Sequence, residues 1–323
     1  MAYSESVLRR AQTRLSQEKA QCEAEAAARI EQIYRRYPRL REIESAMRRS
    51  VSKAVAVAFR KGEDTTAAIE AIKEENLALQ REREWILEAN DLDETLLEPG
   101  VFCPHCGGSG YVGAVMCECL RELCRQEQKK ELSSLLGGKE TFENFRLDYY
   151  PTDIDPNFGV SPRQLMQNTF QRCRRYARDF SRTSPSMLFH GAPGLGKTYL
   201  SACIARTVAD SGFSVVYDSV NKLFSDFEAV RFGGDHSTLI QKYLTCDLLI
   251  IDDLGTEMTN QFTQSVLYQV INTRLMEDKP VIISTNLDDQ AIRQRYTPAI
   301  ASRLLGAYQN CQFLGNDIRQ LRR

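Results

Sequence analysis

Apolar and polar positions follow a regular pattern from residue 186 to the end of the chain. Short apolar runs alternate there with longer stretches whose apolar positions recur every three or four residues. The runs predict five strands, SMLFHG, FSVVYDS, DLLIIDD, PVIISTN and CQFLGN, and the stretches predict helices at about 197–211, 219–230, 236–244, 259–277 and 288–305. Short apolar strands separated by helices indicate a parallel sheet covered on both faces, so the expected fold class is α/β.

The first 95 residues have another pattern, which predicts helices. They are rich in Ala, Glu, Arg, Leu and Gln, and their first glycine is Gly62. Pro38 and the KGED stretch at 61–64 are expected to interrupt them. Two or three helices are therefore expected, as a bundle, a helical hairpin or a coiled coil.

Between these regions the composition changes twice. PGVFCPHCGGSGYVGAVMCEC, residues 99–119, is rich in glycine and cysteine, and ETFENFRLDYYPTDIDPNFGVSP mixes aromatic residues with prolines and aspartates, as an ordered linker does. We expect four segments: a helical N-terminal region at 1–98, a small metal-binding segment at 99–135, a linker with the first part of the α/β module at 136–185, and the α/β core at 186–323.

The bulk composition excludes several classes of protein. Of the 323 residues 42% are hydrophobic and 26% charged, and the net charge of −1 indicates neither a nucleic-acid nor a membrane protein. The chain has no apolar run of the roughly 18 residues that a membrane span needs, and no apolar signal core near its start. These features predict a cytoplasmic protein.

The loop GAPGLGKTYL lies between a predicted strand and a predicted helix and fits the phosphate-binding pattern GxxxxGK[ST]. Its glycines let backbone N–H groups turn toward phosphates, and the helix adds its positive N-terminal end. Lys197 would reach the β- and γ-phosphates and Thr198 would bind Mg²⁺. The expected nucleotide-binding residues here are Gly191, Ala192, Pro193, Gly194, Leu195, Gly196, Lys197, Thr198 and Tyr199.

Polar side chains end two of the later predicted strands, DLLIIDD and PVIISTN. Asp252 and Asp253 follow LLII, at the carboxyl end where open α/β sheets bind ligands. Asp252 would orient Mg²⁺ through water, Asp253 would polarise the attacking water, and Asn286, after PVIIST, would hydrogen-bond the water or the γ-phosphate. Many ATPases have glutamate where Asp253 stands. Aspartate is one methylene shorter, which predicts slow hydrolysis.

Four of the ten cysteines cluster in a short segment, as ligands of a metal do in a reducing compartment. Cys103, Cys106, Cys117 and Cys119 are the expected ligands of a tetrahedral, structural Zn²⁺. The one-residue gap in CEC strains the chelate, so Cys124 and His105 are alternatives for one ligand. A disulfide pair and an empty site are the competing interpretations.

Five segments of the chain, taken in their order, resemble the AAA+ ATPases. They are ETFENFRLDYY, GAPGLGKTYLSACIA, LLIIDDLGTE, STN and SRL. The narrower resemblance, over about residues 140–323, is to bacterial replicative helicase loaders of the DnaC/DnaI type and their IstB-like relatives. CPHCGGSGYV and CECL are similar to the cysteine segment of the Gram-positive loaders. The resemblance implies an AAA+ P-loop sheet of order 5-1-4-3-2. It also implies that a full C-terminal lid is missing, because only four residues follow Arg319.

The same resemblance implies roles for individual residues. It makes Lys197 and Thr198 the Walker A pair, Asp252 and Asp253 the Walker B pair, Asn286 sensor 1, and Arg319 sensor 2. Arg303 takes the arginine-finger position, which would reach the nucleotide of a neighbouring subunit, with Arg293 and Arg295 as rivals. The expected catalytic residues are Asp253, Asn286 and Arg303.

SVNKLFSDFEAVRF, residues 219–232, resembles the extra helix that lines a path for single-stranded DNA in initiator-type AAA+ proteins. Lys222 and Arg231 would contact phosphates, and Phe224 or Phe227 would stack on bases. The competing interpretation is a buried helix face, because the apolar residues repeat at three- and four-residue steps.

The resulting hypothesis is an ATPase that uses ATP, Mg²⁺ and Zn²⁺ and loads a replicative hexameric helicase onto single-stranded DNA, with slow hydrolysis as the release switch. Its helical and zinc segments would grip the helicase, and its AAA+ domain would self-associate. The alternatives are an IstB-like helper of a transposase, a nucleotide-gated adaptor with little hydrolysis, and a small-molecule P-loop kinase. The kinase would need an arginine-rich lid that the sequence lacks.

Overall fold

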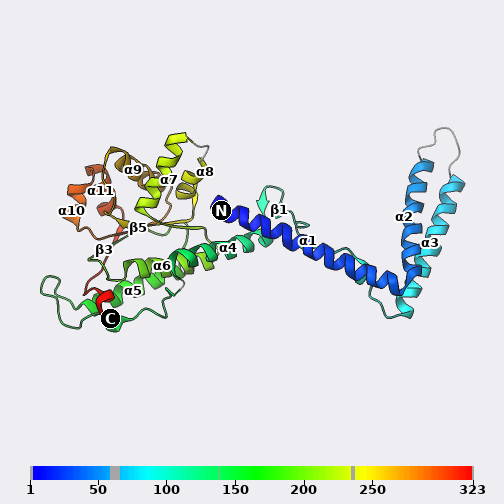
Figure 1. Ribbon diagram of the computed structural model, residues 1–323, viewed down its shortest axis with the longest axis horizontal. Coiled ribbons are helices and arrows are strands. Elements are labelled where there is room, and N and C mark those ends of the chain that lie inside the picture. The colour runs from blue at the N-terminus through cyan, green and yellow to red at the C-terminus, as the bar shows by residue number, and fades with distance from the viewer. Residues whose placement is uncertain (1–2, 59–65, 138, 234–236, 322–323) are drawn as a thin grey trace. The chain divides into compact units, whose positions relative to one another are not determined.

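The computed structural model describes residues 3–58, 66–137, 139–233 and 237–321. The chain forms two units. Figure 1 shows the helices and strands, coloured by residue number from blue at the N-terminus to red at the C-terminus. The first unit comprises Met1–Thr13 and Glu118–Arg323, and the second comprises Arg14–Cys117. Within the described residues, no helix is long and apolar enough to cross a membrane.

The first unit is built on a five-stranded parallel sheet of order β4-β5-β6-β3-β7. Its strands are β3 (Met187–His190), β4 (Val215–Ser219), β5 (Leu248–Leu254), β6 (Val281–Thr285) and β7 (Gln309–Gln312). Counted within this sheet alone, and read from the opposite edge, the order is 5-1-4-3-2. The labels are shifted only because β1 and β2 form a separate hairpin in the cysteine segment. The expected α/β fold and strand order are confirmed.

Helices cover both faces of this sheet, as the apolar strands require. The helices that the first unit contributes are α4 (Glu118–Leu136), α5 (Pro162–Arg178), α6 (Lys197–Asp210), α7 (Val220–Gly233), α8 (Ser237–Thr245), α9 (Gln261–Met276), α10 (Asp289–Arg295), α11 (Pro298–Gly306) and α12 (Ile318–Leu321), with a 3-10 turn at Leu147–Tyr149. Ile250 and Ile282 belong to the core cluster that α5 and α6 complete. Their neighbours Ile251 and Ile283 belong to the cluster on the other face, with α7, α9 and α11.

Two of the expected elements have different bounds in the structure. The single helix expected at 288–305 is two helices, α10 and α11. Pro298 starts α11 after the N-cap Thr297, and a proline lacks the N–H that a continuing helix would need. The last strand, expected at CQFLGN, begins earlier in the chain: Gln309–Gln312 pair with β3.

The second unit is largely helical. It contains most of α1 (Glu5–Arg36), all of α2 (Pro38–Ala58) and α3 (Thr66–Ala89), and a 3-10 turn at Glu94–Leu97. The helix break at Pro38 is confirmed, whereas the expected break at 61–64 lies outside the described residues. A small core between α2 and α3 is formed by Leu40, Ile43, Ile86 and Leu87. Arg39 of α2 forms an ion pair with Glu82 of α3, with Nε and Oε1 2.6 Å apart. The two helices therefore pack as a hairpin.

The cysteine segment contains a short antiparallel hairpin, β1 (Tyr111–Val112) and β2 (Val115–Met116). In the first unit, α4 packs against α6 and reaches the beginning of β4. The Gln128 side chain donates to Phe213 O at 2.9 Å and accepts from Val215 N–H at 3.0 Å. Gln128 thus satisfies backbone groups at the edge of the sheet, which fixes α4 on the α/β module.

Candidate functional site

The glycine loop joins β3 to α6, as the sequence pattern requires. Gly196 has a φ of +88° and occupies the N-cap of α6 in the left-handed region, which favours glycine. Gly194 has a φ of +77°, and a Cβ there would lie 1.8 Å from Asp317 Oδ1. Gly194 O also accepts from Ile318 N–H at 3.1 Å. The end of the chain therefore braces the loop, a contact that the sequence analysis did not anticipate.

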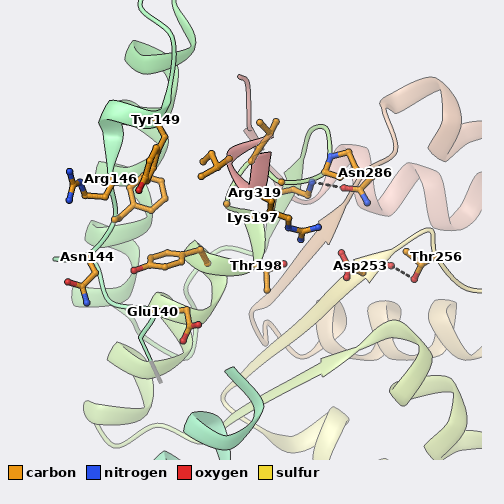
Figure 2. A pocket seen from close by; sticks show the side chains of 17 residues that line it. Glu140, Asn144, Arg146, Tyr149, Lys197, Thr198, Asp253, Thr256, Asn286 and Arg319 are labelled. Atoms are coloured by element: carbon orange, nitrogen blue, oxygen red, sulfur yellow. Dashed lines mark hydrogen bonds between the residues drawn. The ribbon is translucent and has the colours of Figure 1, made fainter. Parts of the chain in front are cut away.

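Lys197 lies at the centre of the site, with its side chain largely buried. Its ammonium donates to Gly191 O at 2.6 Å, Ala192 O at 2.8 Å and Asn286 Oδ1 at 2.6 Å (Figure 2). Burial lowers the pKa of Lys197 to about 8, although the nearby carboxyls of Asp252 and Asp253 act to raise it. The loop and the end of β6 thus converge on one cation.

We expect the affinity for nucleotide to fall as the pH rises past about 8. The Lys197 ammonium is charged below its folded pKa and is progressively lost above it, and bound phosphates would stabilise the charged form. Binding above pH 8 then requires proton uptake, so affinity at pH 9 should be about tenfold weaker than at pH 7. Titration with a fluorescent ATP analogue at both pH values measures this. Equal affinities would contradict it.

Asp252, at the end of β5, is buried and held by three hydroxyl groups. Tyr217 OH donates to its Oδ2 at 2.8 Å, Thr198 Oγ1 donates to its Oδ1 at 3.4 Å, and Ser284 Oγ donates to the same Oδ1. Tyr217 OH also contacts Ser201 Oγ at 3.0 Å. Burial and the Asp252 charge raise the pKa of Tyr217 well above its usual value, so the phenol remains a donor.

Asp253 follows in an unusual backbone conformation, with a φ of +58°. Its N–H donates to Ser284 Oγ at 3.0 Å, and its carbonyl accepts from Thr256 Oγ1 at 2.9 Å (Figure 2). The turn directs the Asp253 side chain into the pocket that Lys197 and Thr198 line. Desolvation and the neighbouring Asp252 charge raise the pKa of Asp253, opposed by Lys197 and Arg319. A raised pKa makes a carboxylate a better proton acceptor.

Lys197, Thr198, Asp253 and Asn286 line a pocket of about 380 Å³. One wall is the glycine loop, and Arg319 of α12 lines the same space. The opposite wall comes from the segment that precedes α5, through Glu140, Asn144, Phe145, Arg146 and Tyr149 (Figure 2). The sequence predicted a linker for this stretch, outside the site. Its aromatic content, unusual for a surface linker, was the available signal.

That wall is fastened to the glycine loop and to α6. Tyr150 OH donates to Leu195 O at 2.9 Å, and Tyr199 OH donates to Thr141 O at 3.2 Å. The Phe145 ring stacks against Tyr150, with centroids 6.0 Å apart. The pocket can therefore hold an anionic group at the loop and a flat, partly apolar group against the aromatic wall.

Arg303 does not line this pocket. From α11 its guanidinium donates to Asn272 Oδ1 at 2.7 Å and to Tyr268 OH at 3.0 Å, and it lies 4.6 Å from the centre of the Tyr268 ring. Arg295, one of the two alternatives for the finger, forms an ion pair with the buried Glu257, with Nε and Oε1 3.6 Å apart. Arg293 is exposed on α10.

The structure revises the expectations for α7. Phe224 and Phe227 are buried in the core cluster beneath the helix, so the expected stacking on bases is wrong and the buried-face interpretation holds. Lys222 is exposed but pairs with Asp226. Arg231 is exposed and lies 5.4 Å above the Phe262 ring.

The four expected cysteine ligands lie together. The Sγ atoms of Cys103, Cys106, Cys117 and Cys119 are all within 4.8 Å of one another. Gly110 N–H donates to Cys106 Sγ at 3.4 Å, as backbone groups do around thiolate ligands. Cys124 and His105 do not belong to this group, and burial raises the pKa of the Cys124 thiol to about 11. Among the described residues no two cysteines form a disulfide. Four convergent thiols fit a tetrahedral metal ion.

Comparison with known proteins bears on the same part of the chain. The DnaC replicative helicase loader of Buchnera aphidicola from Acyrthosiphon pisum is 22% identical over 188 residues, which are 56% of this chain and 73% of that protein. The Escherichia coli K12 DnaC loader is 26% identical over 148 residues, 45% of this chain and 55% of that protein.

Among solved structures, the DnaC helicase loader aligns with a TM-score of 0.44 at 20% identity, over 54% of this chain and 98% of that one. DnaI aligns with a TM-score of 0.42 at 22% identity, over 52% of this chain and 92% of that one. Residues 154–320, more than half of the 323, match the family described as IstB-like ATP binding protein. The chain that places Lys197, Asp253 and Asn286 around one pocket therefore belongs to the IstB-like ATP-binding proteins.

Proposed function

We propose that this protein is an ATPase that loads a replicative hexameric helicase onto single-stranded DNA. The observation that carries the proposal is the convergence of Lys197, Thr198, Asp253 and Asn286 on one pocket of an ATP-binding module, with Asp252 in contact with Thr198. The similarity to proteins named replicative helicase loader supports the choice of reaction partner. We further propose that hydrolysis is slow and serves to release the helicase.

In this proposal each residue has a defined task at the nucleotide. Lys197 binds the β- and γ-phosphates, and Asn286, which already accepts from the Lys197 ammonium, orients the γ-phosphate or the attacking water. Asp253 accepts the proton of that water. Mg²⁺, when bound, would neutralise charge on the phosphates, with Thr198 and Asp252 as the residues that hold it. Arg319 would contact phosphate from α12.

The hydroxyl of Tyr217 is expected to control the metal dependence of nucleotide binding. Replacing Tyr217 by phenylalanine removes one donor from Asp252 Oδ2 and leaves the packing of β4 in place. The carboxylate then loses one of the contacts that fix its orientation, at a cost of about 1.5–3 kcal/mol for a bond to a charged group. We expect at least about tenfold weaker Mg²⁺ affinity, measured by Mg²⁺ titration of a saturated fluorescent nucleotide complex.

Nucleotide affinity without Mg²⁺ provides the control for Tyr217→Phe and should match that of the parent. Ser201→Ala, which removes the other contact of the phenol, should have a smaller effect because Asp252 keeps its donor. Unchanged Mg²⁺ affinity in Tyr217→Phe would show that the contact does not position the carboxylate.

We propose that the four cysteines hold a structural Zn²⁺, which would order a segment with little core of its own. Replacing Cys103 by serine should lower the bound zinc from one ion per chain to none and expose residues 99–119 to limited proteolysis. Nucleotide binding should persist, because no cysteine of the group lines the nucleotide pocket. Cys22→Ser, which lies outside the group, should keep its zinc. Retention of zinc by the Cys103 variant would contradict the assignment.

We propose that residues 1–98 and the zinc segment at 99–135 grip the helicase, while the α/β module at 186–323, with its N-terminal part at 136–185, binds ATP and self-associates. Co-purification with the cognate helicase tests this division. Deleting residues 1–130 should abolish the complex, whereas Lys197→Ala should keep it. Failure of the intact chain to bind the helicase, with capture of a transposase instead, would favour the IstB-like helper.

A second candidate function is a nucleotide-gated adaptor that binds ATP and hardly hydrolyses it. The observation in its favour is Asp253, whose carboxylate is one methylene shorter than the glutamate common at this position. Measured turnover separates the two functions. Negligible turnover by the parent would favour the adaptor. If the parent hydrolyses ATP and Asp253→Asn does so equally fast, Asp253 is not the base.

A further inference from the structure

The outer side of α5 is cationic and carries no acid. Among the 17 residues of this helix there is no aspartate or glutamate. Its buried residues, which include Met166, Cys173 and Ala177, face the core. The exposed side chains are four amides and four arginines, Gln164, Gln167, Asn168, Gln171, Arg172, Arg174, Arg175 and Arg178. We refer to these four arginines as the α5 arginine face.

Most of this positive charge is not balanced by carboxylates. Within the described residues, Arg174 and Arg175 have no ion-pair partner. Arg172 is held by neutral groups of the edge strand β7, Asn310 O at 3.0 Å and Gln309 Oε1 at 2.6 Å. Arg178 pairs with Asp179, the C-cap of the helix, at 2.7 Å. Four arginines therefore face solvent against one adjacent aspartate, on a chain whose net charge is −1.

Two lysines around α7, Lys222 and Lys242, are in a different situation. Lys242 contacts Asp218 and Asp226 at 3.0 Å each, and Lys222 also pairs with Asp226. Tyr243 OH donates to both carboxylates, at 2.8 and 2.7 Å. Two ammonium groups there are matched by two carboxylates, which leaves little net charge to attract a phosphate. An anionic chain is thus drawn more strongly to α5.

We propose that the α5 arginine face binds the phosphate backbone of single-stranded DNA. Guanidinium groups match phosphate oxygens in geometry as well as charge, and amide side chains add bonds to phosphate and sugar. The large exposed apolar side chains of the described chain include none on α5, so the face lacks the apolar anchors typical of protein interfaces. With a rise of 1.5 Å per residue, Arg172 to Arg178 spans roughly 9 Å along the helix, enough to reach neighbouring phosphates of one strand.

This inference deepens the proposed function by naming a surface for the strand, and it rests on that function for the choice of DNA. The test uses the full chain, a saturating non-hydrolysable ATP analogue and a fluorescein-labelled oligo(dT), without helicase. The variant replaces Arg174, Arg175 and Arg178 by alanine. The matched control replaces Arg48, Arg49 and Lys53 of α2, which are also exposed, and removes the same charge from the other unit.

We expect the α5 variant to bind oligo(dT) at least about tenfold more weakly at 0.1 M salt. The slope of log affinity against log salt should become shallower by roughly 2, since each lost contact to a single strand removes about 0.7. The control should bind like the parent, and both variants should keep their ATP affinity. An unchanged slope in the α5 variant, or an equal loss in the control, would overturn the inference.

Two further outcomes separate this inference from the proposed function. If the parent binds ATP and helicase but no oligo(dT), the arginine face is not a strand-binding surface, while the loader proposal loses only its DNA contact. If duplex DNA binds equally well and depends equally on the arginines, the face recognises phosphate of either form, and the restriction to single strands is wrong.

Discussion

Replacing Lys197 by alanine is expected to abolish nucleotide binding, with a loss of affinity of at least about 100-fold. Lys197 supplies the buried cation at which the glycine loop and Asn286 meet, through three contacts of 2.6–2.8 Å. In a desolvated pocket a charge-assisted contact to phosphate is much stronger than one in water, and Lys197 is the one lysine among the described residues that line this pocket. Titration with a fluorescent ATP analogue measures the loss.

Thermal unfolding gives an independent measurement for the same variant. A ligand present at 100 times its dissociation constant stabilises the parent by about 2.7 kcal/mol, and Lys197→Ala should lose this shift. Its unfolding without nucleotide should remain close to that of the parent, because removing the cost of burying the Lys197 charge offsets the loss of its three hydrogen bonds. Lys222→Ala, a change at an exposed lysine of the same unit, should keep the shift. A normal nucleotide shift in Lys197→Ala would refute the assignment of the pocket.

The second large effect is expected from Arg303→Ala, which should reduce ATP turnover by about 10³-fold and leave ATP affinity unchanged. Arg303 does not line the pocket of its own chain, so the role that we propose for it is at the nucleotide of another subunit. Asn272 and Tyr268 of α9 hold its guanidinium in a fixed direction at the surface of α11. An arginine supplied in this way contributes about 10³–10⁵ to turnover in related phosphoryl-transfer reactions.

Mixing two inactive variants tests whether Arg303 acts between subunits. Arg303→Ala keeps an intact pocket, and Lys197→Ala keeps an intact Arg303. A mixture should therefore regain part of the parent turnover, because one subunit completes the site of the other. Arg293→Ala, the exposed rival on α10, should hydrolyse ATP normally. Full activity of Arg303→Ala, or a mixture as inactive as its components, would rule out the arginine finger at this position.

The sequence was sufficient for features that depend on residues close together in the chain. The apolar runs predicted the five strands because a strand buried on both faces needs nearly continuous apolar residues. The glycine loop could be recognised because its backbone conformation depends on the glycines within it, and the resemblance of the sequence segments supplied the strand order that the structure confirms. Pro38 correctly predicted the end of α1, since proline disrupts a helix by its own covalent geometry.

The tertiary structure alone decided which distant residues share a site. Tyr217 contacts Asp252 across 35 residues of sequence, because β4 and β5 are neighbours in the sheet. Residues between 140 and 149 form a wall of the pocket, although the sequence predicted a linker there. The resemblance of α7 to a DNA-lining helix predicted that Phe224 or Phe227 stacks on bases, whereas its helical periodicity indicated a buried face, and packing buried both rings. Local pattern fixes the type of an element, whereas contacts between elements depend on their order and packing in space.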